Sequence, residues 1–218
     1  MRAFSDLTSL KGRVALVAGG ASLAGRAIAA TYAELGAAVA ILDQPGSGAE
    51  DMARSLTDKY GVLAMAIACE TTDTAAMSKV PQRVVDSCGR LDILVNIGVS
   101  ENVPLAQLSP DTWQSALTTG LTAPFLLIQQ AIPGLRVSGK GSIINLSTAT
   151  GVAACATGGG LAQLSRSLAE TLAPHIRVNA VAGGTADDLR GAAAFLASDL
   201  AAHVTGQCLT FGGFGAVS

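Results

Sequence analysis

Short apolar runs alternate with longer amphipathic segments along the chain, and this alternation constrains the fold more than any other feature. The apolar runs have the length and composition of buried strands and lie at 13–18, 38–42, 63–68, 91–96, 142–146, 177–181 and 207–211. The segments between them read as helices, at 24–35, 48–60, 73–88, 111–132, 160–172 and 189–197. With right-handed crossovers, this pattern predicts an α/β fold: a single doubly wound (Rossmann-type) parallel sheet with helices on both faces.

Length and composition limit what such a fold can be. The chain has 218 residues, of which 50% are hydrophobic and 14% charged, and we expect one domain over residues 1–218. A formal net charge of −2 offers no basic surface, so we expect no nucleic-acid partner. The uncharged stretches at 112–135 and 142–165 carry polar residues, proline or many glycines, so we expect no membrane span and a cytoplasmic location.

Cysteine and histidine spacing argues against a metal centre. The chain has two histidines and no Cys-x-x-Cys pair, so we expect no metal site. We expect all of its cysteines to be buried, reduced thiols: Cys69, Cys88, Cys155 and Cys208.

A glycine-rich turn follows the first predicted strand. Gly19 and Gly25 permit a sharp turn and a close approach of the backbone to a pyrophosphate, and the next helix begins there. Asp43 ends the second predicted strand, where an acid can accept hydrogen bonds from a ribose and repel a 2′-phosphate. The pattern favours NAD over NADP. In the alternative interpretation, the glycines only allow helix–sheet packing and Asp43 only caps a loop.

Several segments in the same order resemble the short-chain dehydrogenase/reductase family. They are GRVALVAGGASLAGRAIA, LDILVNIGVS, GSIINLSTATG, SRSLAETLAPHIRVNAVAGGT and FLASDLAAHVTGQCLTFGG. The resemblance implies that a dinucleotide's pyrophosphate lies along Gly19, Ser22, Leu23, Ala24 and Gly25. It also implies that Asp43 binds the adenosine ribose, that Glu70 and Thr71 lie at the adenine, and that Asn96, Ile97 and Gly98 follow the middle of the cofactor.

The chain departs from the family at the Asn–Ser–Tyr–Lys tetrad that performs its chemistry. Gly120 stands at the asparagine position, and Thr148 takes the place of the serine as the one remaining candidate catalytic hydroxyl. Ala154 stands where the family has the tyrosine that moves a proton, and Gly158 where it has the lysine that lowers the pKa of that tyrosine. The resemblance therefore identifies a degenerate member that lacks the tetrad.

Other departures fall around the same region. Leu23 replaces a glycine that usually faces the pyrophosphate, and Gly183 replaces a proline after the sixth predicted strand. The segments 148–154 and 184–189 are shorter than in the family. In relatives the second segment carries a helical lid over the substrate, so the resemblance implies that this chain lacks the lid.

Three functions remain open. The first is an NAD(H)-binding protein without standard dehydrogenase catalysis, acting as a binding, regulatory or partner subunit. The second is an NAD-dependent oxidoreductase acting on a carbonyl or alcohol, with Thr148, Ser147 or a water carrying the proton. The third is a shortened scaffold, natural or engineered.

By resemblance, we also expect a homo-oligomer, a dimer or tetramer, formed through the helices at 111–132 and 160–172. Their weakly charged faces suit a buried interface, and they suit packing against the sheet equally well.

Overall fold

A seven-stranded parallel sheet organises the computed structural model, which describes residues 2–98, 103–148 and 151–212. The strand order is β3-β2-β1-β4-β5-β6-β7, and every neighbouring pair is parallel. The strands are β1 (Val14–Ala18), β2 (Ala38–Asp43), β3 (Ala64–Ala68), β4 (Ile93–Gly98), β5 (Gly141–Ser147), β6 (Ile176–Gly183) and β7 (Cys208–Phe211). The predicted fold class is confirmed.

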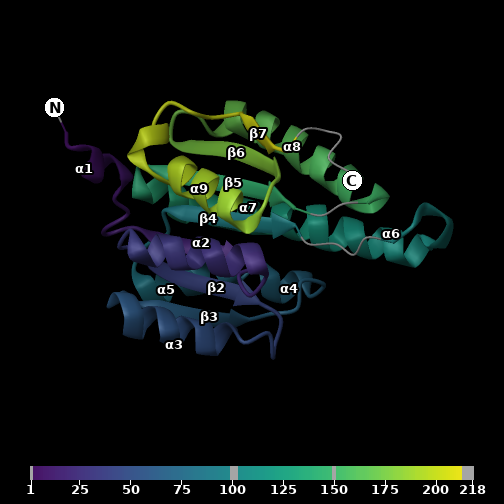
Figure 1. Ribbon diagram of the computed structural model, residues 1–218, viewed down its shortest axis with the longest axis horizontal. Helices are drawn as coiled ribbons and strands as arrows, with labels where there is room; N and C mark the ends of the chain where they lie inside the picture. Colours follow the sequence, from purple (N-terminus) through teal and green to yellow (C-terminus); the bar gives the residue numbers. More distant parts are fainter. Residues whose placement is uncertain (1, 99–102, 149–150, 213–218) are drawn as a thin grey trace.

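Helices cover both faces of the sheet (Figure 1). One layer packs α2 (Leu23–Glu34), α3 (Ala49–Tyr60) and α9 (Ala186–Ala197) against the sheet. The other layer contains α4 (Thr74–Met77), α5 (Val80–Cys88), α7 (Ala123–Ser138) and α8 (Val152–Leu172). The remaining helical segments are α1 (Phe4–Thr8), η1 (Leu105–Gln107), α6 (Pro110–Leu117), η2 (Thr118–Thr122) and η3 (Asp199–Ala201).

Alternate side chains of the central strands enter the two cores. Val17 and Val95 belong to the cluster with α2, whereas Leu16 and Leu94 belong to the cluster with α7, and all four are fully buried. A strand buried on both faces reads as a continuous apolar run rather than an alternating one. This is why the strands were recognisable in the sequence.

Two predicted helices are interrupted. The helix expected at 73–88 is two helices, α4 and α5, and Pro81 lies in the first turn of α5. The helix expected at 111–132 is α6, a π-helical turn (η2) and α7, which continues to Ser138. Pro124 lies in the first turn of α7, a position that proline tolerates because its missing N–H needs no partner there.

The helix that the sequence predicts from about Gly160 begins earlier in the structure. Helix α8 begins at Val152, so the run of three glycines lies inside it. A Cβ on Gly160 would lie 3.2 Å from the Leu121 side chain, in the π-helical turn. Close packing of α8 against its neighbours therefore outweighs the low helix propensity of glycine.

The cysteines differ in exposure, contrary to the expectation that all four are buried. Cys69 is buried, Cys88 and Cys208 are half-buried, and Cys155 on α8 is exposed. In the part of the chain that the structure describes, none of the helices combines the length and the apolar character needed to cross a bilayer.

Candidate functional site

A cavity of about 390 Å³ opens over the carboxyl ends of β1, β2 and β4. The strand order reverses between β1 and β4, because β2 and β3 lie on one side of this pair and β5, β6 and β7 on the other. Ligands of open parallel sheets bind at such a switch point. Asp43 is the one ionisable side chain among the described residues that line the cavity.

The turn between β1 and α2 forms one wall. Gly19 has a φ of +75°, in the left-handed region that favours glycine. The Ser22 hydroxyl donates to the Gly19 carbonyl (2.6 Å) and accepts from the Gly25 N–H (3.1 Å), which fixes the start of α2. A Cβ on Gly25 would lie 2.3 Å from the Gly19 carbonyl oxygen, so α2 can begin this close to the turn only with glycine there.

Leu23, the first residue of α2, projects away from the protein. Its side chain is 79% exposed, and it is not among the residues that line the cavity. The amino end of a helix attracts anions through its free N–H groups and its dipole. A large apolar side chain therefore stands at the approach to this helix end.

Asp43 lies at the end of β2 and binds the glycine-rich turn. Its Oδ2 accepts from the Ala21 N–H (2.7 Å), and its Oδ1 accepts from the Gln44 N–H (2.8 Å). An ionised carboxylate has about four acceptor positions, so it can accept further hydrogen bonds from a ligand. The predicted loop-capping role and the predicted ligand role are thus compatible in one side chain.

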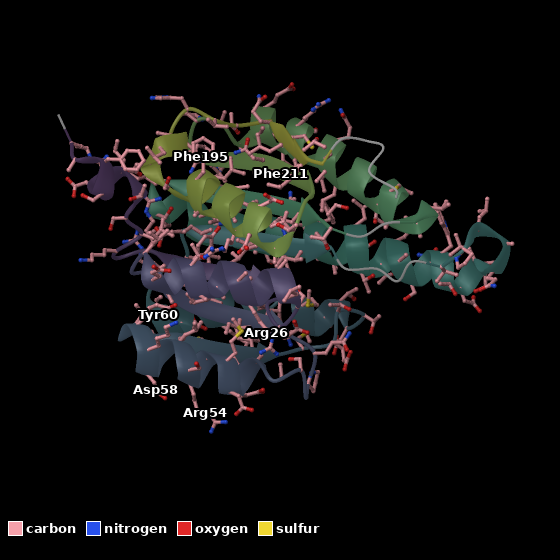
Figure 2. All side chains as sticks on the ribbon, viewed as in Figure 1. Arg26, Arg54, Asp58, Tyr60, Phe195 and Phe211 are labelled. Atoms are coloured by element: carbon pink, nitrogen blue, oxygen red, sulfur yellow. The ribbon has the colours of Figure 1, made fainter. Side chains whose placement is uncertain are left out.

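Arg26 joins the same turn to the loop after β2 (Figure 2). Its Nε donates to the Ala21 carbonyl (2.8 Å), and one terminal nitrogen donates to the Ser47 carbonyl (3.2 Å). The guanidinium therefore holds the backbone of Ser47, a residue that lines the cavity.

Two buried polar side-chain atoms at this cavity have no hydrogen-bond partner in the described structure: Ser47 Oγ and Asn96 Oδ1. The Asn96 amide is held by a buried chain in which its Nδ2 donates to Asn145 Oδ1 (2.8 Å) and Asn145 Nδ2 donates to Ser165 Oγ (2.9 Å). That chain uses the Asn96 amide nitrogen as a donor and leaves its carbonyl oxygen as an acceptor without a partner. Each unmet buried polar group costs about 1–3 kcal/mol.

The positions that the resemblance assigns to the tetrad lie over β5, beside this cavity. A Cβ on Gly158 would lie 2.4 Å from Ser147 Oγ and 2.9 Å from Ser147 Cβ. A Cβ on Gly120 would lie 2.9 Å from Thr157 Oγ1. The side chains of Ser147 and Thr157 therefore lie where the Cβ atom of a larger residue would have to go.

The other tetrad positions offer little acid–base chemistry. Ala154 is buried in α8, and Thr148 is half-buried directly after β5, outside the cavity lining. Residues 149 and 150, in the shortened segment, lie outside the described residues. Tyr32 is fully buried and donates to the Ala193 carbonyl (3.0 Å), and burial raises the pKa of its phenol.

The structure brings part of the predicted cofactor set together. The predicted residues that line the cavity are Gly19, Ser22, Asp43, Thr71, Asn96 and Ile97. Those that lie outside its lining are Leu23, Ala24, Gly25, Glu70, Gly98 and the candidate hydroxyl Thr148. Sequence reasoning missed two residues of the lining, Ser47 and Thr119, the second of which enters the cavity from the π-helical turn. The one signal for Ser47 is that it lies four positions after Asp43.

Comparisons with known proteins agree with this architecture. A family model described as short chain dehydrogenase matches residues 13–192. The chain is 36% identical to a cis-4-hydroxycyclohexanecarboxylate dehydrogenase of Sinomonas cyclohexanicum, with 94% of this chain and 97% of the relative covered. It is 33% identical to a D-threitol dehydrogenase of Mycolicibacterium smegmatis, with 94% and 93% covered.

The solved structure of an NADPH-dependent 3-quinuclidinone reductase from Rhodotorula rubra has the same fold, with a TM-score of 0.89 at 22% identity over 100% of this chain and 96% of the other. The alignment with the Sinomonas relative runs over 244 positions, more than the 218 residues of this chain, so that relative has segments that this chain lacks. The match over residues 13–192 and the identity to full-length relatives place the chain in the short-chain dehydrogenase family.

Proposed function

We propose that this chain, as one domain, binds NAD(H) at the switch-point cavity and lacks ordinary dehydrogenase turnover, serving as a binding, regulatory or partner subunit. The observation that carries the proposal is the contact of α8 with the end of β5. A Cβ on Gly158, at the position of the family's lysine, would lie 2.4 Å from Ser147 Oγ. Helix α8 packs closely against Ser147 at this position, and Gly158 itself supplies no cation to a substrate there.

The missing groups bear directly on the chemistry. A bound dinucleotide would supply or accept a hydride at its nicotinamide ring. Carbonyl reduction also needs a proton donor, which contributes about 10²–10⁴-fold, and stabilisation of the developing alkoxide. Ala154 and Gly158 supply neither, and Tyr32 is buried against α9.

Asp43 supports a preference for NAD over NADP. Its carboxylate retains acceptor positions for ribose hydroxyls, and the described cavity lining has no cation to hold a 2′-phosphate. A phosphate placed there would meet a like charge.

We further propose a homo-oligomer formed through the faces of α6–α7 and α8, within 111–132 and 160–172. Phe125 on α7 is a large apolar side chain that is 42% exposed. Gln129, Gln130 and Gln163 add exposed polar groups without charge. Sedimentation equilibrium would test this, and a strictly monomeric mass at micromolar concentration would contradict it.

A second candidate is an NAD-dependent oxidoreductase of an alcohol or carbonyl with altered catalytic groups. The names of the two relatives described above favour it, since both are dehydrogenases. Ser147 and Thr148 supply hydroxyls at the end of β5. Loss of turnover in Thr148→Val, with unchanged NADH binding, would support this candidate.

Equilibrium titration with NADH and NADPH, followed by a turnover assay on a panel of alcohols and carbonyls, tests the proposal. We expect a dissociation constant for NADH in the micromolar range, about −8 kcal/mol, at least about tenfold weaker binding of NADPH, and no turnover above background. Absence of binding at millimolar NADH would contradict the binding role. Sustained turnover would contradict the non-catalytic role and favour the second candidate.

A further inference from the structure

We propose that Arg26 is a positioning residue for the nucleotide, because it holds two walls of the switch-point cavity in the arrangement that binds a dinucleotide. This inference rests on the proposed nucleotide-binding function and names a residue outside the cavity that sets its affinity. Arg26 lies near the start of α2, is exposed and is not among the residues that line the cavity. It therefore acts through the residues that it holds.

The Arg26 guanidinium bridges two walls that come from different parts of the chain. One wall is the glycine-rich turn, which contributes Ala21 to the lining, and the other is the loop after β2, which contributes Ser47. Arg26 Nε donates to the Ala21 carbonyl (2.8 Å), and Arg26 Nη2 donates to the Ser47 carbonyl (3.2 Å). Because one rigid planar group makes both hydrogen bonds, the walls cannot move apart without breaking at least one of them.

Ala21 connects Arg26 to the proposed ribose acceptor, Asp43. The Ala21 N–H donates to Asp43 Oδ2 (2.7 Å), while the Ala21 carbonyl accepts from Arg26 Nε. One residue of the turn is thus held at both of its backbone groups, by the carboxylate and by the guanidinium. Loss of Arg26 removes one of these two attachments, so the Asp43 carboxylate is then less firmly oriented towards a ligand.

The loop after β2 approaches Arg26 closely at two successive residues. The Ser47 N–H donates to the Gln44 carbonyl (3.2 Å), which closes a turn and directs the Ser47 carbonyl to the guanidinium. Gly48 follows with a φ of +83°, in the left-handed region that favours glycine. A Cβ on Gly48 would lie 3.4 Å from Arg26 Nη2, so the guanidinium packs against the backbone of this loop as well as donating to it.

Ordering the two walls before the ligand arrives raises the affinity of the cavity. When only a fraction of molecules has the binding-competent arrangement, the dissociation constant rises by the inverse of that fraction. We expect about one molecule in ten to keep both walls in place without Arg26, which raises the dissociation constant about tenfold. A lysine would carry the same charge on a single nitrogen, without the forked donors that reach two carbonyls.

Isothermal titration of the full chain with NADH tests this inference. We expect Arg26→Ala and Arg26→Lys each to weaken NADH binding about tenfold, with urea unfolding midpoints close to that of the wild type because the side chain is exposed. Arg54→Ala is the matched control, since Arg54 pairs with Asp51 on α3, is 74% exposed and lies outside the cavity lining (Figure 2). This control should change the affinity by less than about twofold.

Each other outcome has a definite meaning. Wild-type affinity in Arg26→Ala would overturn the inference and leave the proposed function intact. Full recovery of affinity in Arg26→Lys would also overturn it, because the effect would then belong to the charge rather than to the two hydrogen bonds. Absence of NADH binding by the wild type would overturn both the inference and the proposed function.

A double-mutant cycle with Asp43→Asn adds a measurement that a loss of stability would not change. Because Arg26 acts partly by orienting the Asp43 carboxylate through Ala21, the two substitutions should not be additive. We expect Arg26→Ala to weaken NADH binding only about threefold in the Asp43→Asn background. The same loss of about tenfold in both backgrounds would contradict the positioning role of Arg26.

Discussion

The two ends of the parallel strands differ in how completely the polar groups next to them are paired. At the amino ends of the strands, here called the amino edge, the Asp199 carboxylate forms ion pairs with Arg2 (2.8 Å), Arg13 and Lys140 (3.1 Å). At the carboxyl edge, the cavity leaves Ser47 Oγ and Asn96 Oδ1 without partners.

This difference separates stability from function. The amino-edge ion cluster (Arg2, Arg13, Lys140 and Asp199) is complete within the chain and ties the first residues, β1 and the start of β5 to the end of α9. The carboxyl edge carries buried polar groups that water or a ligand must satisfy, which is a cost to stability that a binding site explains. Substitutions at one edge should therefore change unfolding, and substitutions at the other should change binding.

The largest expected effect is at Asp199. Asp199→Ala leaves Arg13, itself 12% exposed, without its carboxylate partner and should lower the free energy of unfolding by about 3 kcal/mol, with NADH affinity unchanged. Asp187→Ala is the matched control, because Asp187 pairs with Arg190 on the surface of α9 and is 84% exposed. Urea denaturation of both variants measures the two losses in unfolding free energy. Equal destabilisation by Asp199→Ala and Asp187→Ala would contradict the stabilising role of the amino-edge ion cluster.

The contribution of Asp199 to the free energy of unfolding should also depend on pH. Burial raises the pKa of Asp199, but hydrogen bonds from Arg2, Arg13 and Lys140 outweigh burial and hold it well below its ordinary range. Because the folded pKa is depressed, the stabilisation is complete above the unfolded value, about 3.9, and is lost as the pH falls below it. The difference in unfolding free energy between wild type and Asp199→Ala should therefore be constant from pH 5 to 7, within about 0.5 kcal/mol, and shrink towards pH 2. A difference independent of pH down to 2 would contradict this assignment.

Neighbouring glycines in α8 should respond with opposite signs. Gly158→Ala places a methyl group against Ser147 and should cost about 2 kcal/mol, since overpacking costs about 1–3 kcal/mol. Gly159→Ala meets nothing within 4 Å and should stabilise the helix by about 0.5–1 kcal/mol. Thermal or urea unfolding measures both. Stabilisation by both variants would show that α8 has room over β5 and would weaken the non-catalytic proposal.

Asp43 should govern cofactor choice rather than stability. Asp43→Asn keeps an oxygen to accept from the Ala21 N–H but removes the negative charge and the acceptor for the Gln44 N–H. We expect the ratio of NADPH to NADH dissociation constants to fall by about tenfold, or 1.4 kcal/mol, and the free energy of unfolding to fall by about 1 kcal/mol at most, since the Gln44 N–H is exposed to water. An unchanged ratio in parallel titrations would mean that Asp43 acts only within the turn.

How much could be predicted from the sequence differs between these regions. Strand β1 and its neighbours were recognisable because burial on both faces demands continuous apolar runs such as residues 13–18. The changes to the predicted helices could not be recognised in the sequence. The π-helical turn at Thr118–Thr122 and the early start of α8 at Val152 depend on packing between segments distant in sequence. Local propensity cannot report such contacts.

The site shows the same division. Gly19, Ser22 and Asp43 could be assigned to one place because the ends of adjacent parallel strands meet at one edge of the sheet. Ser47 and Thr119 could not, since a loop and a π-helical turn bring them to the cavity. The exposure of Leu23 likewise depends on how α2 meets its turn.

The most direct test of the central claim is a crystal structure of the protein with NADH. The account predicts NADH in the switch-point cavity, with hydrogen bonds to Asp43, Ser47 and Asn96, and no side chain of the described β5 or α8 placed to transfer a proton next to the nicotinamide ring. A nicotinamide ring ordered against Ser147 or Thr148, with space opened beside Gly158, would contradict it and restore the oxidoreductase interpretation.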